Sequence, residues 1–390
     1  MNRRFRVAVV GGGIGGCTLA LALRARGVQA DVYERAPELR EVGAAVAISA
    51  NGNRVLRSLG LVEQVAERAA VPTELIYRHW RDGRRTSAHE VGQRYEREFG
   101  APYFGVHRAD LQRVLVDALG PDGVHTGREL VDLRETGGGA QLVFADGTGA
   151  EADLVVGADG VRSTVRRWIA DEETAVYSGT SGFRGLVPVE QLTELPDPGA
   201  IQFWTGPGAH LLHYPIGDGD VVNFLAVVDE PRRWESASWV AEAAPEEIAG
   251  SFAGWHPAVV QMVSATALHQ RWALFGQRPL NSWHRGRAVL LGDAAHAMLP
   301  HHGQGANQTI EDAAVLANCL VGAGDDLDGA LRAYERLRRA RTRRVALDSW
   351  LASAQLHLPD GPDADRRDEI LDAVPESIRW IHEYDAVAAG

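Results

Sequence analysis

The feature that most constrains this 390-residue chain is a glycine-rich turn between a short apolar run and an Ala/Leu-rich segment near the N-terminus. The run at 5–10 is rich in β-branched residues, which predicts a strand buried on both faces. The turn occupies 11–16, and the segment at 17–26 favours a helix. A second strand is expected at 30–33. This order of strand, turn, helix and strand predicts a parallel βαβ unit.

Each glycine of the turn has its own physical task. Gly11 makes the tight turn, Gly13 lets the backbone approach a pyrophosphate, and Gly16 lets the helix pack closely against the strand. The helix N-terminus then offers free N–H groups and the positive end of its dipole to an anion. Glu34 lies 18 residues after Gly16, where its carboxylate can accept hydrogen bonds from a ribose diol. We therefore predict dinucleotide binding; the alternative is a glycine turn without a ligand.

Charge and composition argue against several other classes of protein. The 52 acidic and 40 basic residues give a net charge of −12, which argues against a surface for nucleic acid or an anionic membrane. The arginines at 332–344 alternate with apolar residues at helical spacing and indicate a solvated helix face. The sequence contains no Lys, which excludes a P-loop and a Lys Schiff base.

The two cysteines and the hydropathy pattern bear on the compartment. Cys17 and Cys319 cannot build a disulfide framework, and we expect two buried thiols. No run of about 18 apolar residues is present, so no transmembrane helix is expected. We expect a cytoplasmic protein, a monomer or a homodimer, that binds neither nucleic acid nor a membrane.

Two further motifs follow predicted strands later in the chain. DGVRSTVR (159–166) follows a strand at 153–156. GDAAH (292–296) follows a strand at 288–291 and leads to Pro300 and GQGAN (303–307). Together with the glycine turn, and in this order over most of the chain, these motifs closely resemble the single-component FAD-dependent aromatic hydroxylases, the family of para-hydroxybenzoate and salicylate hydroxylases.

This resemblance implies an FAD site. The three glycines of the turn would hold the pyrophosphate, and Glu34 the adenosine ribose. Arg40 and Arg108 match arginines near the phosphates and the ribityl chain, Leu130 lies in a strand that passes the adenine, and Asp293 would bond the ribityl chain. The expected cofactor-binding residues are Gly11, Gly13, Gly16, Glu34, Arg35, Arg40, Arg108, Leu130, Asp159, Asp293, Gly303, Gly305, Ala306 and Asn307.

Two of these regions would act on the reacting part of the cofactor. Residues 303–307 would place backbone N–H groups and a helix N-terminus at the flavin pyrimidine edge, where they stabilise the negative charge of reduced flavin. Asp159 and Arg166 match the motif that touches both FAD and the incoming nicotinamide cofactor. The alternatives are that Asp293 only caps the next helix and that Asp159 is a plain turn residue.

The resemblance also implies the reaction. Only one Gly-x-Gly-x-x-Gly unit is present, so NADH or NADPH has no fold of its own here and would visit the flavin, reduce it and leave. Dioxygen then adds to the reduced flavin at C4a, and the resulting hydroperoxide transfers a hydroxyl group to an electron-rich ring. The protein excludes water and helps to deprotonate a phenol.

A strand at 210–214 is expected to face the substrate. In a strand, His210 and Tyr214 share one face and His213 takes the other. The resemblance to hydroxynicotinate and hydroxybenzoate hydroxylases places a His and a Tyr of this strand beside the ring, and His301 near the reacting edge of the flavin. We expect His210, Tyr214 and His301 to be catalytic. The alternatives are that the first two only pack in the sheet, that a register slip brings in His213, or that His301 has no role.

The expected fold is α/β (α+β overall): a Rossmann-type FAD-binding domain interleaved with a mixed β-sheet substrate domain, followed by a long C-terminal helix. Residues 177–228 carry Phe, Trp, Tyr and Val between Gly, Asp and Pro turns, which predicts the separate sheet. The expected ranges are 1–75, 100–176 and 270–330 for the FAD-binding domain, 76–99 and 177–269 for the substrate domain, and 331–390 for the helical segment.

We expect an NAD(P)H- and dioxygen-dependent FAD monooxygenase that hydroxylates a small phenolic acid of the hydroxybenzoate, salicylate or amino-hydroxybenzoate type. Ala47 argues against a hydroxynicotinate as the substrate, because some pyridine hydroxylases of the family carry a His near this position. Two alternatives stay open: the same fold acting on a bulkier polyketide or terpenoid, and an FAD reductase or electron carrier that inserts no oxygen. A pocket with a converging Arg, His and Tyr would favour the phenolic acid.

Overall fold

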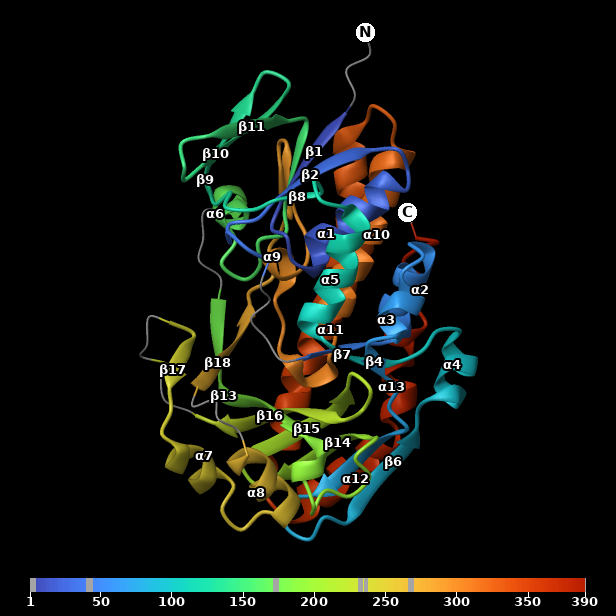
Figure 1. Cartoon of the computed structure of the whole chain (residues 1–390), viewed down its shortest axis with the longest axis vertical. Coiled ribbons are helices and arrows are strands. Elements are labelled where there is room, and N and C mark those ends of the chain that lie inside the picture. Colours follow the sequence, from blue (N-terminus) through green and yellow to red (C-terminus); the bar gives the residue numbers. More distant parts are fainter. Residues whose placement is uncertain are drawn as a thin grey trace.

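A computed structural model describes residues 5–39, 45–170, 175–230, 234, 238–265 and 270–389. Two large sheets lie at opposite ends of an elongated molecule, and helices lie between and beside them (Figure 1). One sheet is mostly parallel and the other is mixed, so the predicted combination of a Rossmann-type part with a mixed sheet is confirmed.

The six-stranded sheet is built around β1, whose residues 7–10 are buried and pair in parallel with β2 on one side and β12 on the other. The helix after the glycine turn begins at Ile14, earlier than the predicted 17, because Gly15 and Gly16 are themselves helical. In spatial order the strands are β19 (His284–Arg285), β20 (Ala288–Leu290), β12 (Leu154–Gly157), β1 (Arg6–Val10), β2 (Gln29–Tyr33) and β8 (Val124–His125).

Helices and two small sheets surround this parallel sheet. The helix α1 packs against α5 and α10, so the glycine turn lies among buried elements. The helices are α1 (Ile14–Arg24), α2 (Ala50–Ser58), α3 (Val62–Ala66), α4 (Gln93–Phe99), α5 (Arg108–Leu119), α6 (Thr164–Ala170), α9 (Asp293–His296) and α10 (Gly305–Gly322). The small sheets are β11-β10-β9 (Gly149–Ala152, Gly139–Phe144, Leu130–Thr136) and β3-β7-β4 (Ala45–Ile48, Phe104–His107, Ala69–Ala70).

The eight-stranded sheet separates an outer core from the interior of the molecule. On its outer face Leu211 and Phe224 pack against α7 (Pro245–Ser251) and α8 (Pro257–Ser264), whereas Leu212 and Tyr214 face inward. The predicted alternation in this strand is therefore confirmed. In spatial order the strands are β17 (Val240–Glu242), β18 (Gln270–Gln277), β13 (Ala175–Pro188), β16 (Val221–Asp229), β15 (Ala209–Ile216), β14 (Ile201–Gly206), β5 (Glu74–His79) and β6 (Arg85–Glu90). A 3₁₀ turn, η1 (Val189–Gln191), follows β13.

The division into domains stays a prediction. The strand β18 joins the eight-stranded sheet, although residues 270–277 were expected in the FAD-binding domain.

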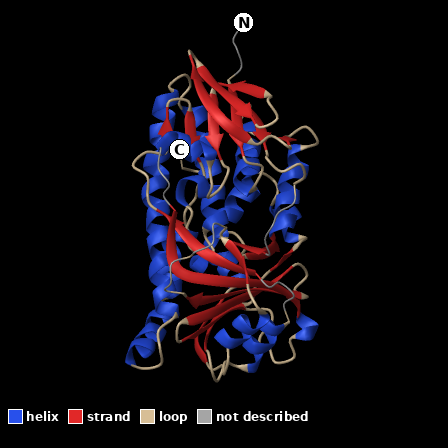
Figure 2. Ribbon diagram, turned by 90° about the vertical axis from the view of Figure 1, so that its left-hand side faces the viewer, coloured by secondary structure: helices blue, strands red, loops and turns tan. Residues whose placement is uncertain are grey.

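Three C-terminal helices complete the fold, and the longest of them extends beside both sheets (Figure 2). They are α11 (Leu327–Leu356), α12 (Pro362–Asp372) and α13 (Val374–His382). The expectation of a solvated arginine face on α11 is wrong for Arg338, which is fully buried and pairs with Glu311 and Asp312 of α10. These two carboxylates give a buried cation the partners it needs. In the described parts of the chain, no helix is long and apolar enough to span a bilayer.

Candidate active site

A cavity of about 420 Å³ extends from the glycine turn to the inner face of the eight-stranded sheet. Its walls come from α1, the strand β3, the turn η2 (Pro300–His302), the start of α10 and the C-terminal helix α13. One space therefore connects the predicted dinucleotide site with the predicted substrate sheet.

The glycine turn forms a backbone cradle in which two of the glycines leave no space for a side chain. Gly11 has a φ of +113°, and a Cβ there would lie 2.3 Å from the carbonyl oxygen of Ala158. A Cβ on Gly16 would lie 1.9 Å from the carbonyl oxygen of Gly11. Gly13 is the N-cap of α1 and lines the cavity, and no side chain caps this helix. Its first N–H groups are thus available to an anion, which fits the pyrophosphate of FAD.

Glu34 holds this cradle in place. Its carboxylate accepts hydrogen bonds from the backbone N–H groups of Gly12 at 2.8 Å and Ala36 at 2.9 Å. Each carboxylate oxygen keeps a further acceptor site for a ribose hydroxyl. Arg35 is exposed, Leu130 is buried and does not line the cavity, and Arg40 lies outside the described residues.

The opposite end of the cofactor region is formed where α9 and α10 begin. Asp293, Gly303, Gly305 and Ala306 line the cavity, as Arg108 of α5 also does. No side chain caps α10, so its N-terminus presents free N–H groups toward the same space. This position fits a negative charge on a reduced flavin ring.

Three residues that the sequence analysis placed at the cofactor do not line the cavity but bond to segments that do. The Asn307 side chain does not line it; instead it accepts from the N–H of Ser49 and donates to the carbonyl of Ala47. Asp159 caps α6 through the N–H of Thr164 at 2.7 Å. Arg166 donates to two backbone carbonyls of α9, and burial lowers the pKa of its guanidinium to about 10. These side chains position the loops that line the cavity.

The substrate end of the cavity is an apolar wall that carries one cation. Cross-strand pairs align Arg184, Leu225, Leu212, Phe203 and Tyr77 in one row across the sheet. All five line the cavity, so the accessible part of the Arg184 side chain faces an enclosed space. Burial lowers the pKa of Arg184, with a further contribution from the nearby Arg108.

Arg184 is poorly compensated where it stands. Its guanidinium lies over the ring of Trp272, 5.4 Å from the centroid. Among the residues that the structure describes, no carboxylate pairs with it, and its Nε has no hydrogen-bond partner. A cation in an apolar wall without an acidic partner is a binding group for an anionic ligand.

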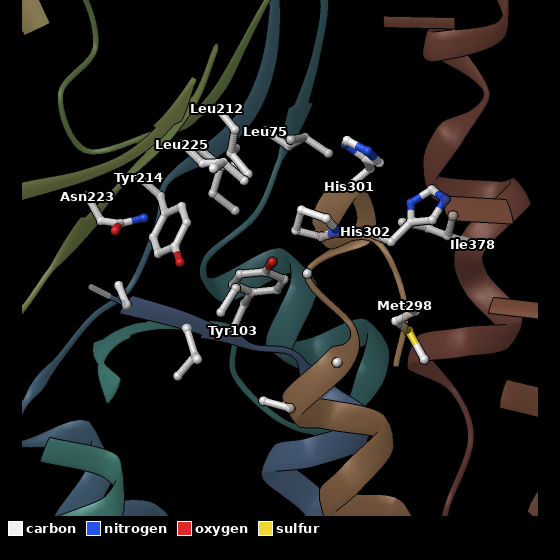
Figure 3. A pocket seen from close by; sticks show the side chains of 18 of the residues that line it. Leu75, Tyr103, Leu212, Tyr214, Asn223, Leu225, Met298, His301, His302 and Ile378 are labelled. Atoms are coloured by element: carbon white, nitrogen blue, oxygen red, sulfur yellow. The ribbon is translucent and has the colours of Figure 1, made fainter. Parts of the chain in front are cut away.

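Two tyrosines face each other across this end of the cavity, as Figure 3 shows for Tyr103 and Tyr214. Burial raises the pKa of Tyr103 to about 12 and also raises the pKa of Tyr214, to which Tyr103 contributes. Both hydroxyls therefore stay protonated near neutral pH. They can donate a hydrogen bond to a ligand oxygen but cannot act as a base.

The predicted histidines are found at different depths. His301 lines the cavity, and burial lowers its pKa to about 3, so it is neutral at pH 7. His210 shares the inward face of β15 with Tyr214, but it does not line this cavity. Its ring lies behind His301, with 5.1 Å between the two ring centroids. The expectation that His210 lies directly beside the substrate ring is therefore corrected. His213 faces the opposite side, so the slipped register is not adopted.

Sequence reasoning missed Arg184, Tyr103 and the wall formed by Ile378 and His382 of α13. A signal existed for Arg184, because it is the one charged residue in the otherwise apolar second half of its strand, 182–188. Neither Tyr103 nor α13 carried such a signal, since only the packing of distant segments brings them to the cavity.

Comparisons with known proteins agree with this geometry. Residues 4–349 match the sequence family described as "FAD binding domain". A 3-amino-4-hydroxybenzoate 2-monooxygenase of Streptomyces platensis is 39% identical over 100% of this chain and 98% of its own. A salicylate hydroxylase of Pseudomonas putida is 35% identical over 97% of this chain and 92% of its own. The crystal structure of Klebsiella pneumoniae HpxO with FAD and uric acid superposes with a TM-score of 0.86 at 28% identity, covering 99% of this chain and 97% of that one.

Proposed function

Because this chain belongs to the FAD-dependent aromatic hydroxylases, we propose that it uses NADH or NADPH and dioxygen to hydroxylate a small phenolic acid. An amino-hydroxybenzoate is the first candidate substrate, since the relative at 39% identity is named for one. We expect it to act in the cytoplasm, as a monomer or a homodimer.

The single observation that carries this proposal is the half-buried guanidinium of Arg184 in an apolar wall beside two tyrosines. A benzoate ring fits an apolar surface, a carboxylate fits the cation, and a phenolic hydroxyl fits the tyrosine hydroxyls. A bulky polyketide or terpenoid without a carboxylate would leave Arg184 without a partner. The converging Arg, His and Tyr thus favour the phenolic acid over the first alternative.

When bound, FAD supplies the redox chemistry and the activation of dioxygen. The N-terminus of α1 would hold the pyrophosphate, and N–H groups at the start of α10 would face the flavin ring. Arg184 orients the carboxylate of the substrate, and Tyr214 donates a hydrogen bond to the oxygen of the phenolic hydroxyl. The C-terminal helix α13 closes the wall of the cavity and excludes water.

The test is a substrate panel on the FAD-loaded enzyme, with NADH or NADPH in air. Hydroxybenzoates, salicylate and 3-amino-4-hydroxybenzoate are compared by stimulated NAD(P)H oxidation and by product mass under isotopically labelled dioxygen. We expect one labelled oxygen atom in the product of at least one phenolic acid. NAD(P)H oxidation without label in any product would instead support the reductase alternative.

A further inference from the structure

A chain of three buried histidines leads from the cavity to an exposed carboxylate. His301 lines the cavity, and His210 lies directly behind it. The Nδ1 of His210 is 2.6 Å from the Nε2 of His357, and the Nδ1 of His357 is 2.5 Å from the Oδ1 of Asp229. The Asp229 side chain is 52% exposed, whereas the three histidines are buried. The series therefore begins at the ligand space and ends at solvent.

The step from His301 to His210 has no direct hydrogen bond, but the distance between the two ring centroids is close to that of the bonded pair. The centroids of His301 and His210 are 5.1 Å apart, and those of the bonded pair His210 and His357 are 4.9 Å apart. Both ring nitrogens of His301 lack a partner among the described residues. We infer that a rotation of the His301 ring, whose nitrogens have no competing partner in the described part of the chain, completes the series.

Backbone contacts fix the outer end of the series. His357 is the residue at which α11 ends, and its carbonyl accepts the N–H of Gly208 at 2.9 Å. The carbonyl of Gly208 in turn accepts the N–H of Asp229 at 2.8 Å. The turn between β14 and β15 thus fixes the backbones of His357 and Asp229 next to each other.

We propose that His301, His210, His357 and Asp229 form a relay that carries the proton of the substrate hydroxyl from the cavity to solvent. The inference rests on the proposed function, because a phenolic hydroxyl is the source of the proton. The O–H bond of the substrate breaks and its proton binds one ring nitrogen of His301, while the proton on the other nitrogen passes to His210.

The remaining transfers follow the printed hydrogen bonds. The proton on Nδ1 of His210 passes to Nε2 of His357, and the proton on Nδ1 of His357 passes to Asp229, from which water removes it. No electron moves, and the substrate remains as the phenolate. Each histidine accepts at one nitrogen and donates at the other, which only a neutral imidazole does.

The surroundings keep the imidazoles of His210 and His301 neutral between transfers. Burial lowers the pKa of His210, and the facing His357 and His301 lower it further. Burial also lowers the pKa of His301, with contributions from His357 and His302. Asp229 is the acidic group of the series, and among the residues described its carboxylate contacts the ring of His357.

The experiment mixes the FAD-loaded enzyme with 4-hydroxy-3-nitrobenzoate, a phenolic acid whose phenolate absorbs visible light, at a pH below the pKa of the free phenol, so that the ligand enters with its proton. Stopped-flow mixing follows binding by the flavin spectrum, ionisation by phenolate absorbance, and proton release by an indicator dye. For Asp229→Asn and His357→Gln we expect unchanged binding and ionisation slowed by about 10-fold or more, given that acid–base assistance contributes about 10²–10⁴-fold. Added imidazole buffer should restore the rate in Asp229→Asn and leave the wild-type rate unchanged.

Asp220→Asn is the matched control, because it removes an exposed carboxylate from the other end of β16. Circular dichroism and flavin content check that each variant folds. Ionisation at the wild-type rate in both Asp229→Asn and His357→Gln would overturn the relay, whereas a wild-type enzyme that binds no phenolic acid would overturn the proposed function and the relay with it. A purely structural role would lower stability but would give no rescue by imidazole.

Discussion

Replacing Arg184 with methionine should weaken the binding of a phenolic carboxylate and leave the binding of the corresponding phenol unchanged. Arg184 lines the cavity, has no acidic partner among the described residues, and is stabilised by the ring of Trp272 alone at 5.4 Å. A ligand carboxylate would be its first full partner. Methionine keeps an unbranched, flexible side chain and removes the charge.

The magnitude follows from the kind of bond that is lost. A hydrogen bond to a charged group contributes about 1.5–3 kcal/mol, so Kd for the carboxylate should rise roughly 10- to 150-fold. The free protein should become more stable, because an uncompensated cation leaves an apolar wall. A higher melting temperature together with weaker carboxylate binding is an outcome that simple loss of structure cannot produce.

The assay is titration of the FAD-loaded protein with 3-amino-4-hydroxybenzoate and with 2-aminophenol, which lacks the carboxylate. Arg285→Met is the matched control, since Arg285 also lies over a tryptophan ring, that of Trp168, but outside the cavity. Equal loss of affinity for both ligands would refute the reasoning. A fall in FAD affinity with unchanged carboxylate affinity would assign Arg184 to the cofactor instead.

Three further predictions concern the cradle, the buried ion pairs and the buried histidines. Gly16→Ala should abolish FAD binding because its Cβ would lie 1.9 Å from the Gly11 carbonyl, whereas Gly138→Ala meets nothing and should keep normal flavin absorbance per chain. Arg338→Leu removes the buried cation between Glu311 and Asp312, which keep only Arg341 and His296 as ionic partners among the described residues, and should cost about 3–5 kcal/mol in urea unfolding; a smaller loss would mean that these remaining partners or water compensate. Burial lowers the pKa of His213 to about 3, so its contribution to stability is present above the unfolded pKa of about 6.5 and is lost as pH falls, by about 2 kcal/mol at pH 5. His213→Leu should remove that much of the difference in unfolding free energy between pH 7.5 and pH 5, and an unchanged difference would show that His213 is not responsible.

Local sequence determined the parts of this protein that depend on near neighbours. The turn at 11–16 requires glycine, because a Cβ on Gly11 or Gly16 would lie only 1.9–2.3 Å from a backbone carbonyl oxygen. The strand and the helix around this turn follow from residue periodicity. The alternation that puts Leu212 and Tyr214 on one face of β15 and Leu211 on the other is likewise a property of any strand. These features need no knowledge of distant segments.

Only the tertiary structure decided what surrounds each of those faces. Arg184 is a substrate-binding candidate because neighbouring strands align apolar residues beside it, and Asn307 is withdrawn from the cavity because its amide bonds Ser49, 258 residues away. His210 contacts His357, which lies 147 residues away in the sequence. Only this tertiary packing shows that His210 lies behind the wall of the cavity and does not line it. The physical reason is that hydrogen-bond partners and burial are set by packing between segments, whereas periodicity and glycine content act within a few residues of the chain.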